Sequence, residues 1–355
     1  MTNLQTYTGN HVWRGPDIAE SSKWAHTFTS QEIKTLKDAA DAVIDREIVS
    51  LGSDDFDLCE LDTVLQGCRA ELTDGYGFVL LRGLPVADWP VARTARAYWA
   101  ICSRIGLPIA QNPVGNLLGH VIDVGGDSSH PHQRAHQSSD NLPFHTDIGA
   151  EIASLLCLHN ARSGGESHLV SSSALWNKLV ATRPDLAETL THPFHLDRRG
   201  EVIEGQEPCF VMPAFIPTAD RILSCYNPRF VHSAQRFKQV PRLTHSQVEA
   251  LDTVMALANE EQFKLKMDFC PGDIQLINNF QLLHSRSEYK DWPEPDRRRH
   301  LWRVWLCVPG GKPIPDALYA RFGADEETGR PQGTNLPPGI KFTAPLDLQP
   351  CEHNE

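Results

Sequence analysis

From Gly106 to Val308 the chain consists mostly of short strand-like runs separated by glycine, proline and asparagine. This alternation restricts the fold more than any other feature of the sequence, because short apolar runs between turn-forming residues are typical of β-strands. The clearest runs are Gly119–Val124, Ala153–Leu158, Ile274–Ile277 and His300–Val308. Many short strands at irregular spacing predict a sandwich or jelly roll rather than a doubly wound parallel sheet.

Helical patterns lie mainly before this region. Residues 29–32 (TSQE) and 244–247 (THSQ) have the sequence of a capping box, in which two side chains satisfy the first free N–H groups of a helix. Apolar residues at helical spacing follow both boxes, and the same spacing predicts helices over Leu61–Leu72 and Pro90–Ile105. We expect Gly106 to end the Pro90–Ile105 helix as a left-handed cap.

The domain organisation that these patterns predict is a single domain over residues 1–355. Its N-terminal arm and helices take residues 1–75, and its β-rich core, with a helical insert, takes residues 76–308. A Pro- and Gly-rich extension over residues 309–355 is expected to wrap around the surface. A chain of 355 residues is long enough to bury a sizeable core.

Charge and composition exclude several classes of partner. The formal net charge of −12 makes nucleic acid an unlikely ligand, since an acidic protein repels phosphate backbones. The sequence has neither a signal peptide nor an apolar run long enough to span a membrane, so no membrane partner is expected. Nine cysteines without a CxxC pair point to a reducing, cytoplasmic location. A small-molecule substrate is the expected partner, and the sequence is compatible with a homo-oligomer.

Three residues form a candidate metal site. His145 and Asp147 are two residues apart in the extended sequence FHTD, and side chains at i and i+2 of a strand point to the same face. His284, which follows the sequence GDIQLINN, supplies a second imidazole. Two imidazoles and a carboxylate form the facial triad of non-heme iron(II) oxygenases, which leaves metal positions open. An isolated HxD pair, in contrast, also fits a surface histidine beside an aspartate.

Two arginines lie on one face of the strand predicted at 299–308. Arg299 and Arg303 alternate there with Leu301, Trp305 and Cys307, and should stand about 13 Å apart along the strand. Inward-facing arginines are costly unless an anion compensates them. A dicarboxylate can supply that anion, because a guanidinium grips a carboxylate with two parallel hydrogen bonds. The alternative is an edge strand with solvated arginines.

Taken together and in their order, the motifs of residues 75–308 resemble those of the TauD/TfdA family of 2-oxoglutarate oxygenases. The segments that carry this resemblance are 77–85 (GFVLLRGLP), 144–147 (FHTD), 164–167 (GGES), 272–279 (GDIQLINN), His284 and 298–303 (RRHLWR). The resemblance implies a mainly β fold with flanking helices, namely the double-stranded β-helix, or cupin-like jelly roll. It also implies Fe(II), 2-oxoglutarate and O2 as cofactor and cosubstrates.

The resemblance also assigns roles to individual residues. The family's metal ligands fall on His145, Asp147 and His284, its 2-oxoglutarate contacts on Arg299, Ser167 and Arg303, and its substrate contacts on Arg303, Asn141, Gln111 and Asn112. Ser167 takes the place of a threonine in the family's motif. Turn formation is the alternative role for the asparagines.

The implied reaction is the oxidation of an unactivated C–H bond of a small, anionic or amino-acid-like substrate, with decarboxylation of 2-oxoglutarate to succinate. Hydroxylation, desaturation and cyclisation are all compatible with this chemistry, and specialised metabolism is a plausible setting. Two other readings stay open. One is a non-catalytic jelly-roll binding protein, and the other is a cupin-type metal-dependent isomerase, which would need no dicarboxylate clamp.

Overall fold

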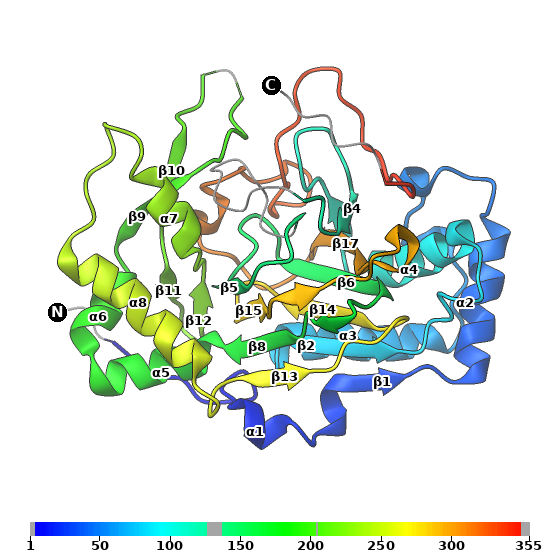
Figure 1. Ribbon diagram of the computed structural model, residues 1–355, viewed down its shortest axis with the longest axis horizontal. Helices are drawn as coiled ribbons and strands as arrows, with labels where there is room; N and C mark the ends of the chain where they lie inside the picture. Colours follow the sequence, from blue (N-terminus) through cyan, green and yellow to red (C-terminus); the bar gives the residue numbers. More distant parts are fainter. Residues whose placement is uncertain (1–3, 126–136, 204, 349–355) are drawn as a thin grey trace.

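The computed structural model describes residues 4–125, 137–203 and 205–348, and its centre is a pair of facing β-sheets (Figure 1). The larger sheet has the strand order β1-β2-β14-β6-β17-β3, with β4 also paired to β17, and the smaller sheet has the order β13-β8-β15-β5. The larger sheet contains β1 (Ala25–Thr27), β2 (Phe78–Arg82), β3 (Leu107–Ile109), β4 (Leu118–Val121), β6 (Ile152–His159), β14 (Ile274–Asn278) and β17 (His300–Cys307). The smaller sheet contains β5 (Leu142–His145), β8 (Ser167–Ser171), β13 (Leu265–Met267) and β15 (Leu282–Arg286).

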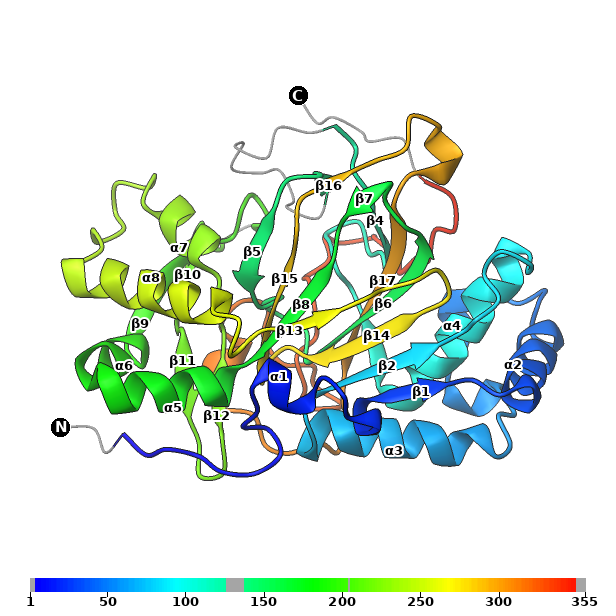
Figure 2. The same ribbon diagram turned by 60° about the horizontal axis from the view of Figure 1, so that its bottom comes forward.

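Helices cover the two ends of this sandwich (Figures 1 and 2). At one end α2 (Ser30–Ala42), α3 (Leu61–Asp74) and α4 (Val91–Ile105) pack against the larger sheet. At the other end lie α5 (Ser172–Thr182), α6 (Pro184–Leu190), α7 (Pro228–Ala234) and α8 (His245–Asn259). The strand pairs β9 (Pro193–Asp197) with β10 (Cys209–Pro213), and β11 (Phe215–Pro217) with β12 (Ile222–Ser224), accompany this second group. Further short elements are α1 (Gly15–Ile18), β7 (Ser163–Gly164) and β16 (Tyr289–Lys290). Short 3-10 helices are formed by Ser22–Trp24, Ile48–Ser50, Ser53–Asp55, Pro295–Arg297 and Asp316–Tyr319.

Strand β17 separates an apolar face from a polar one. Trp302, Val304 and Leu306 are buried in the core that the larger sheet shares with α2, α3 and α4. The alternate residues point to the opposite face, where Arg303 and Trp305 line a cavity. Side chains alternate across a strand, so a single eight-residue strand completes the helical core and also furnishes the interior polar face.

The structure contains the predicted strands and helices with small shifts of their ends, and both capping boxes form, at Thr29 and Thr244. The left-handed cap expected at Gly106 is wrong, because this residue is extended, with φ −172°. A Cβ atom built on Gly106 would lie 2.3 Å from the carbonyl oxygen of Cys307. Glycine is therefore required by the close approach of β17.

Residues 309–348 run along the body of the protein. The backbone N–H of Thr334 donates to the carbonyl oxygen of Ala110 at 2.8 Å. The backbone N–H of Leu117 donates to the carbonyl oxygen of Thr343, also at 2.8 Å. Buried Arg330 also donates to the carboxylate of buried Glu151. No helix in the described ranges is long and apolar enough to cross a membrane. The division of the chain into arm, core and extension stays a prediction.

Breaking the Glu151–Arg330 pair should destabilise the protein. Both residues are at most 6% exposed, and Glu151 Oε2 also accepts a hydrogen bond from the N–H of Val308 at 2.9 Å. Arg330→Ala leaves a buried carboxylate without its cation, so we expect a loss of about 3–5 kcal/mol in the free energy of unfolding, measured with urea. Arg297→Ala, at a half-exposed ion pair, is the control and should cost less than about 1 kcal/mol. Equal losses in the two variants would contradict this role for Arg330.

A histidine pair should make the attachment of the extension sensitive to acid. His300 Nε2 lies 2.8 Å from His120 Nδ1. The other ring nitrogen of His120, Nε2, lies 3.0 Å from the carbonyl oxygen of Pro345. Burial, together with the nearby His120 and His159, lowers the pKa of His300 to about 4, and burial lowers that of His120 despite Asp347.

Because the folded pKa lies below the unfolded value of about 6.5, this pair costs nothing at pH 7 and lowers stability as the pH falls from about 6.5 toward 4. His300→Gln keeps a donor for His120 but does not titrate. Its unfolding free energy should therefore fall less than that of the wild type between pH 7 and pH 5, by about 1–2 kcal/mol. Parallel pH profiles of the two proteins would rule out the effect.

Candidate active site

A cavity of about 720 Å³ lies between the two sheets. The larger sheet lines it with Val121, Ala153, Leu155, Gln275, Ile277, Leu301, Arg303 and Trp305, and the smaller sheet with Leu142, His145, Ser167, His284 and Arg286, among others. The volume lies in the range of pockets that enclose small molecules. The polar groups in this cavity come from several strands, so its chemistry depends on how the two sheets face each other.

His145, Asp147 and His284 converge in this cavity. His145 and His284 are paired residues on the adjacent antiparallel strands β5 and β15, which places their ring centroids 4.3 Å apart. Asp147 follows β5, and its Oδ1 atom lies 3.8 Å from His145 Nε2. One ligand atom from each of the three residues lies within 4.8 Å of the others, which is compact enough to surround one ion.

Three neighbours hold Asp147. Arg303 Nη1 and Trp305 Nε1 donate to its Oδ2 atom, at 3.3 and 3.0 Å. The backbone N–H of Asp147 donates to the side-chain oxygen of Asn279 at 3.2 Å. Because Oδ2 is occupied by these donors, the Oδ1 atom is the one turned toward His145.

The protonation states of the three residues suit metal binding. Burial lowers the pKa of His145, and it lowers the pKa of His284 to about 3. Burial alone would raise the pKa of Asp147, but the positive charge of Arg303 and the hydrogen bond from Trp305 help to hold this pKa well below its usual range. At neutral pH the site therefore contains two neutral imidazoles and one carboxylate, the forms in which these side chains bind metals.

The orientation of the rings also fits iron(II). His145 Nδ1 donates to the carbonyl oxygen of Pro143 at 2.9 Å, which leaves Nε2 with a lone pair toward Asp147. His284 Nδ1 is buried and has no hydrogen-bond partner in the described part of the chain. A compact set of two imidazoles and a carboxylate is the donor set of non-heme iron sites.

The far end of the cavity suits an anion. Arg299 is 7% exposed, and its Nη1 atom has no hydrogen-bond partner among residues 4–125, 137–203 and 205–348. Its guanidinium carbon lies 5.2 Å from the ring centroid of Tyr289, and that of Arg286 lies 4.6 Å from the same centroid. Gly165 of the GGES sequence leaves room for Arg299, because a Cβ atom there would lie 3.0 Å from Arg299 Nε. A dicarboxylate would offset this buried positive charge.

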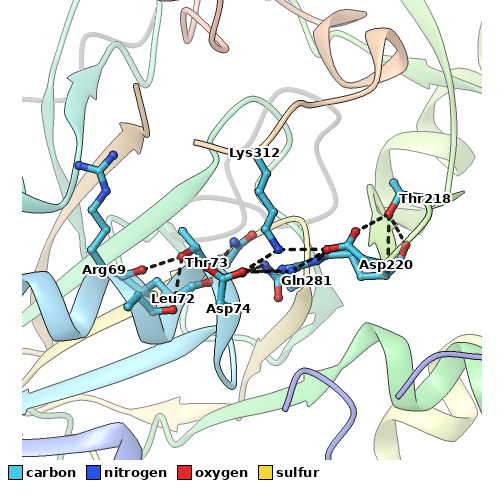
Figure 3. Close-up of polar contacts among 11 residues, drawn as sticks. Arg69, Leu72, Thr73, Asp74, Thr218, Asp220, Gln281 and Lys312 are labelled. Atoms are coloured by element: carbon cyan, nitrogen blue, oxygen red, sulfur yellow. Dashed lines mark hydrogen bonds and ion pairs between the residues drawn. The ribbon is translucent and has the colours of Figure 1, made fainter. Parts of the chain in front are cut away.

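The β14–β15 turn that carries Asn279 is anchored at the C-terminal end of α3. Asn278 and Gln281 donate to the carbonyl oxygens of Leu72 and Thr73, at 3.1 and 3.2 Å. In the same region Lys312 bridges two carboxylates, as Figure 3 shows, with Nζ 2.6 Å from Asp74 and 3.0 Å from Asp220. These contacts join a helix end, a hairpin and the C-terminal extension around the turn that supports Asp147.

The other residues singled out from the sequence have varied positions. Ser167 lines the cavity and hydrogen-bonds the amide of Gln275 at 3.0 Å. Gln111 lies behind Arg303 rather than in the cavity lining, and accepts a hydrogen bond from Arg303 Nε at 2.7 Å. Asn112 accepts from the N–H of Asn116 at 3.1 Å, as a turn-forming asparagine does.

Asn141 is exposed and is likewise outside the cavity lining. Asn141 directly precedes β5, which begins at Leu142. The alternation of side chains between the two faces of the strand therefore does not extend to it. The cavity geometry therefore does not bring Asn141, Asn112 or Gln111 to a position beside the metal ligands.

Sequence reasoning missed several residues of the site. Trp305 is buried, and its indole N–H also donates to Asp147. Asn279 accepts a hydrogen bond from the backbone N–H of Asp147. Gln275 and Arg286 also line the cavity. The sequence did contain a signal for each of the other residues. Trp305 shares a strand face with Arg303, and Gln275 belongs to the GDIQLINN motif. Arg286 lies two residues after His284 on β15.

Comparison with known proteins identifies the family. The sequence model of the taurine catabolism dioxygenase TauD, TfdA family matches residues 39–305. The chain is 28% identical over 322 residues to the FR-33289 synthase of Streptomyces rubellomurinus, which covers 88% of this chain and 93% of that protein. It is 32% identical over 332 residues to a taurine hydroxylase-like protein of Stachybotrys chartarum, which covers 87% of this chain and 83% of that protein.

The fold has the same relatives. A solved asparagine oxygenase in complex with Fe(II), 3-hydroxyasparagine and succinate superimposes with a TM-score of 0.61 at 15% identity, covering 80% of this chain and 93% of that one. The jelly roll with flanking helices expected from the sequence is thereby confirmed. The chain belongs to the TauD/TfdA family and is a non-heme dioxygenase that uses Fe(II), 2-oxoglutarate and O2.

Proposed function

We propose that this enzyme oxidises an unactivated C–H bond of a small anionic or amino-acid-like substrate, most simply by hydroxylation, and converts 2-oxoglutarate to succinate. The observation that carries the proposal is the convergence of His145, Asp147 and His284 in one cavity with the buried guanidinium of Arg299. The relatives support the substrate class, since one is named for taurine, an aminosulfonate, and another was solved with a hydroxylated amino acid.

His145, Asp147 and His284 are the proposed iron ligands. Iron(II), when bound, supplies the site at which 2-oxoglutarate and oxygen react. The chain itself presents two neutral imidazoles and holds one carboxylate oxygen in place through Arg303 and Trp305. Outer contacts of this kind orient a ligand and tune its affinity for the metal.

Arg299 is the proposed partner of the far carboxylate of 2-oxoglutarate, with Ser167 as an additional hydrogen-bond donor. Both residues line the cavity, and the hydroxyl of Ser167 already contacts Gln275. Arg303 contacts Asp147 and Gln111, so its main effect is to position the metal ligand. A contact of Arg303 with substrate or cosubstrate stays a prediction.

Loss of Arg299 should strongly weaken cosubstrate binding while leaving the iron site intact. Addition of 2-oxoglutarate to the iron(II)-loaded protein without oxygen should produce a visible charge-transfer band. The Arg299→Ala variant should need at least about 100-fold more 2-oxoglutarate to produce this band, because it loses a buried bidentate ion pair with the cosubstrate. His284→Ala should give no band. Arg297→Ala removes a half-exposed arginine two residues away and should behave as the wild type.

If iron binds to the wild type but no band forms, the Arg299 end of the cavity is not a 2-oxoglutarate site. A normal titration in the Arg299→Ala variant would place the cosubstrate elsewhere in the cavity.

A second test isolates the indole that holds Asp147. Trp305→Phe keeps the aromatic ring and removes the N–H that donates to Asp147 Oδ2. We expect iron(II) to bind about 10-fold more weakly, in the range found when an outer contact to a metal ligand is removed. Trp302→Phe is the matched control, since this residue lies on the opposite face of β17 and its Nε1 atom has no partner in the described ranges. Equal iron affinities in the two variants, from anaerobic titration, would exclude the positioning role.

A further inference from the structure

Gln111 holds both the backbone and the side chain of Arg303. Its Nε2 atom donates to the carbonyl oxygens of Leu117 and Arg303, at 2.9 and 2.8 Å. Its Oε1 atom accepts from Arg303 Nε at 2.7 Å. Both N–H groups of the amide and its oxygen therefore have partners, which fixes the orientation of a residue that is only 2% exposed.

The contact on Arg303 reaches the metal ligand. A guanidinium is planar and rigid, so a partner on Nε also determines where Nη1 points. Arg303 Nη1 donates to Asp147 Oδ2 at 3.3 Å, so Gln111 acts on Asp147 through one intervening side chain. A neutral amide suits this place, because a carboxylate would face two carbonyl oxygens and would compete with Asp147 for the charge of Arg303.

Strand β4 leaves room for this amide. Gly119 of β4 is paired with Arg303 of β17, and a Cβ atom at Gly119 would lie 3.1 Å from Gln111 Oε1. This distance is shorter than an ordinary van der Waals contact, so a side chain at this position would push the amide away from Arg303. The glycine is therefore part of the arrangement that holds Arg303.

The loop that carries Gln111, residues 110–117, is attached at its start to the C-terminal extension. Ala110 is paired with Gly333, and its carbonyl oxygen accepts from the N–H of Thr334 at 2.8 Å. Gly333 has a left-handed φ of +77°, and a Cβ atom there would lie 2.6 Å from the carbonyl oxygen of Ala110. The extension therefore lies directly against the backbone next to Gln111.

The end of the same loop is attached to the extension as well. The N–H of Leu117 donates to the carbonyl oxygen of Thr343 at 2.8 Å, and the N–H of Thr343 donates to the carbonyl oxygen of Gly115 at 2.9 Å. The hydroxyl of Thr343 also donates to Asn116 Oδ1 at 2.7 Å. The loop is thus fixed on both sides of Gln111 by one segment, residues 333–343.

We propose that Gln111 is a positioning residue for the metal site and that the C-terminal extension determines its place. Residues 333–343 hold the loop, Gln111 holds Arg303, and Arg303 holds Asp147. This inference rests on the proposed function, since it specifies how a proposed iron ligand is kept in place. It makes the orientation of Asp147 depend on a segment that is far from it in the chain.

The first test replaces Gln111 by leucine, which has a similar volume but neither donates nor accepts a hydrogen bond. Gln111→Leu should bind iron(II) about 10-fold more weakly in anaerobic calorimetry, because Arg303 loses the partner that orients it. Gln235→Leu is the matched control, since this half-buried glutamine also holds backbone groups through its amide, but in the segment that follows α7. The control should bind iron(II) as the wild type does.

A spectroscopic readout separates positioning from a loss of folding. At saturating iron(II) and 2-oxoglutarate, without oxygen, the charge-transfer band of Gln111→Leu should be shifted, because the band depends on the ligands around the iron. A variant that is only less stable would show the wild-type band with a reduced amplitude. Urea unfolding of each variant measures that stability separately.

The second test changes the extension and leaves Gln111 in place. Gly333→Ala adds a methyl group that meets Ala110, whereas a methyl group at Gly339, where φ is +84°, would meet no atom of the described residues within 4 Å. Both variants share the strain of a side chain at positive φ, so only the clash differs. Gly333→Ala should weaken iron(II) binding by about 3-fold or more, and Gly339→Ala should leave it unchanged.

A double variant tests whether the extension acts through Gln111. In the Gln111→Leu background, Gly333→Ala should cause no further loss of iron(II) affinity, because the contact that transmits the effect is already absent. Losses that add in full would overturn this route.

The outcomes separate this inference from the proposed function. Absence of the charge-transfer band in the wild type would refute the proposed function. A normal wild-type band, together with an unchanged iron(II) affinity and band position in Gln111→Leu, would overturn the positioning role. Equal iron(II) affinities of Gly333→Ala and Gly339→Ala would overturn the role of the extension, and this comparison remains decisive if Gln111→Leu fails to fold.

Discussion

The carboxylate of Asp147, enclosed between two sheets and held by Arg303 and Trp305, is the interaction on which the rest of the site depends. A buried carboxylate is costly unless it is paired and hydrogen-bonded. Here strand β17 provides both donors from one face, while its other face completes the helical core. The stability of the β17–β6 pairing and the geometry of the metal ligands are therefore coupled, because one strand determines both.

A second layer of contacts keeps this arrangement rigid. The turn between β14 and β15 holds the backbone of Asp147 through Asn279, and Asn278 and Gln281 attach that turn to the end of α3. Lys312 and Arg330 bring the C-terminal extension to the same region. Ligands placed by rigid elements keep the short distances that a metal site needs. The extension, although distant in sequence, thus contributes to the same support.

Positively charged side chains are distributed along the lining of the cavity. Arg299 and Arg286 lie against Tyr289 at one end, and Arg303 lies beside Asp147. Arg199 and Arg321 lie against the ring of Phe230. An acidic protein with a positive interior repels most anions at long range and binds those that enter.

The sequence by itself determined the strands, the capped helices, the two faces of β17 and the spacing of His145, Asp147 and His284, because each depends on local periodicity or on a motif within a few residues. Only the tertiary structure decided which polar groups meet. Gln111 was expected at the substrate and lies behind Arg303, and the side chain of Asn279 holds the backbone of Asp147. These contacts join residues far apart in the chain, and they depend on how sheets, turns and loops pack against each other, which no local pattern records.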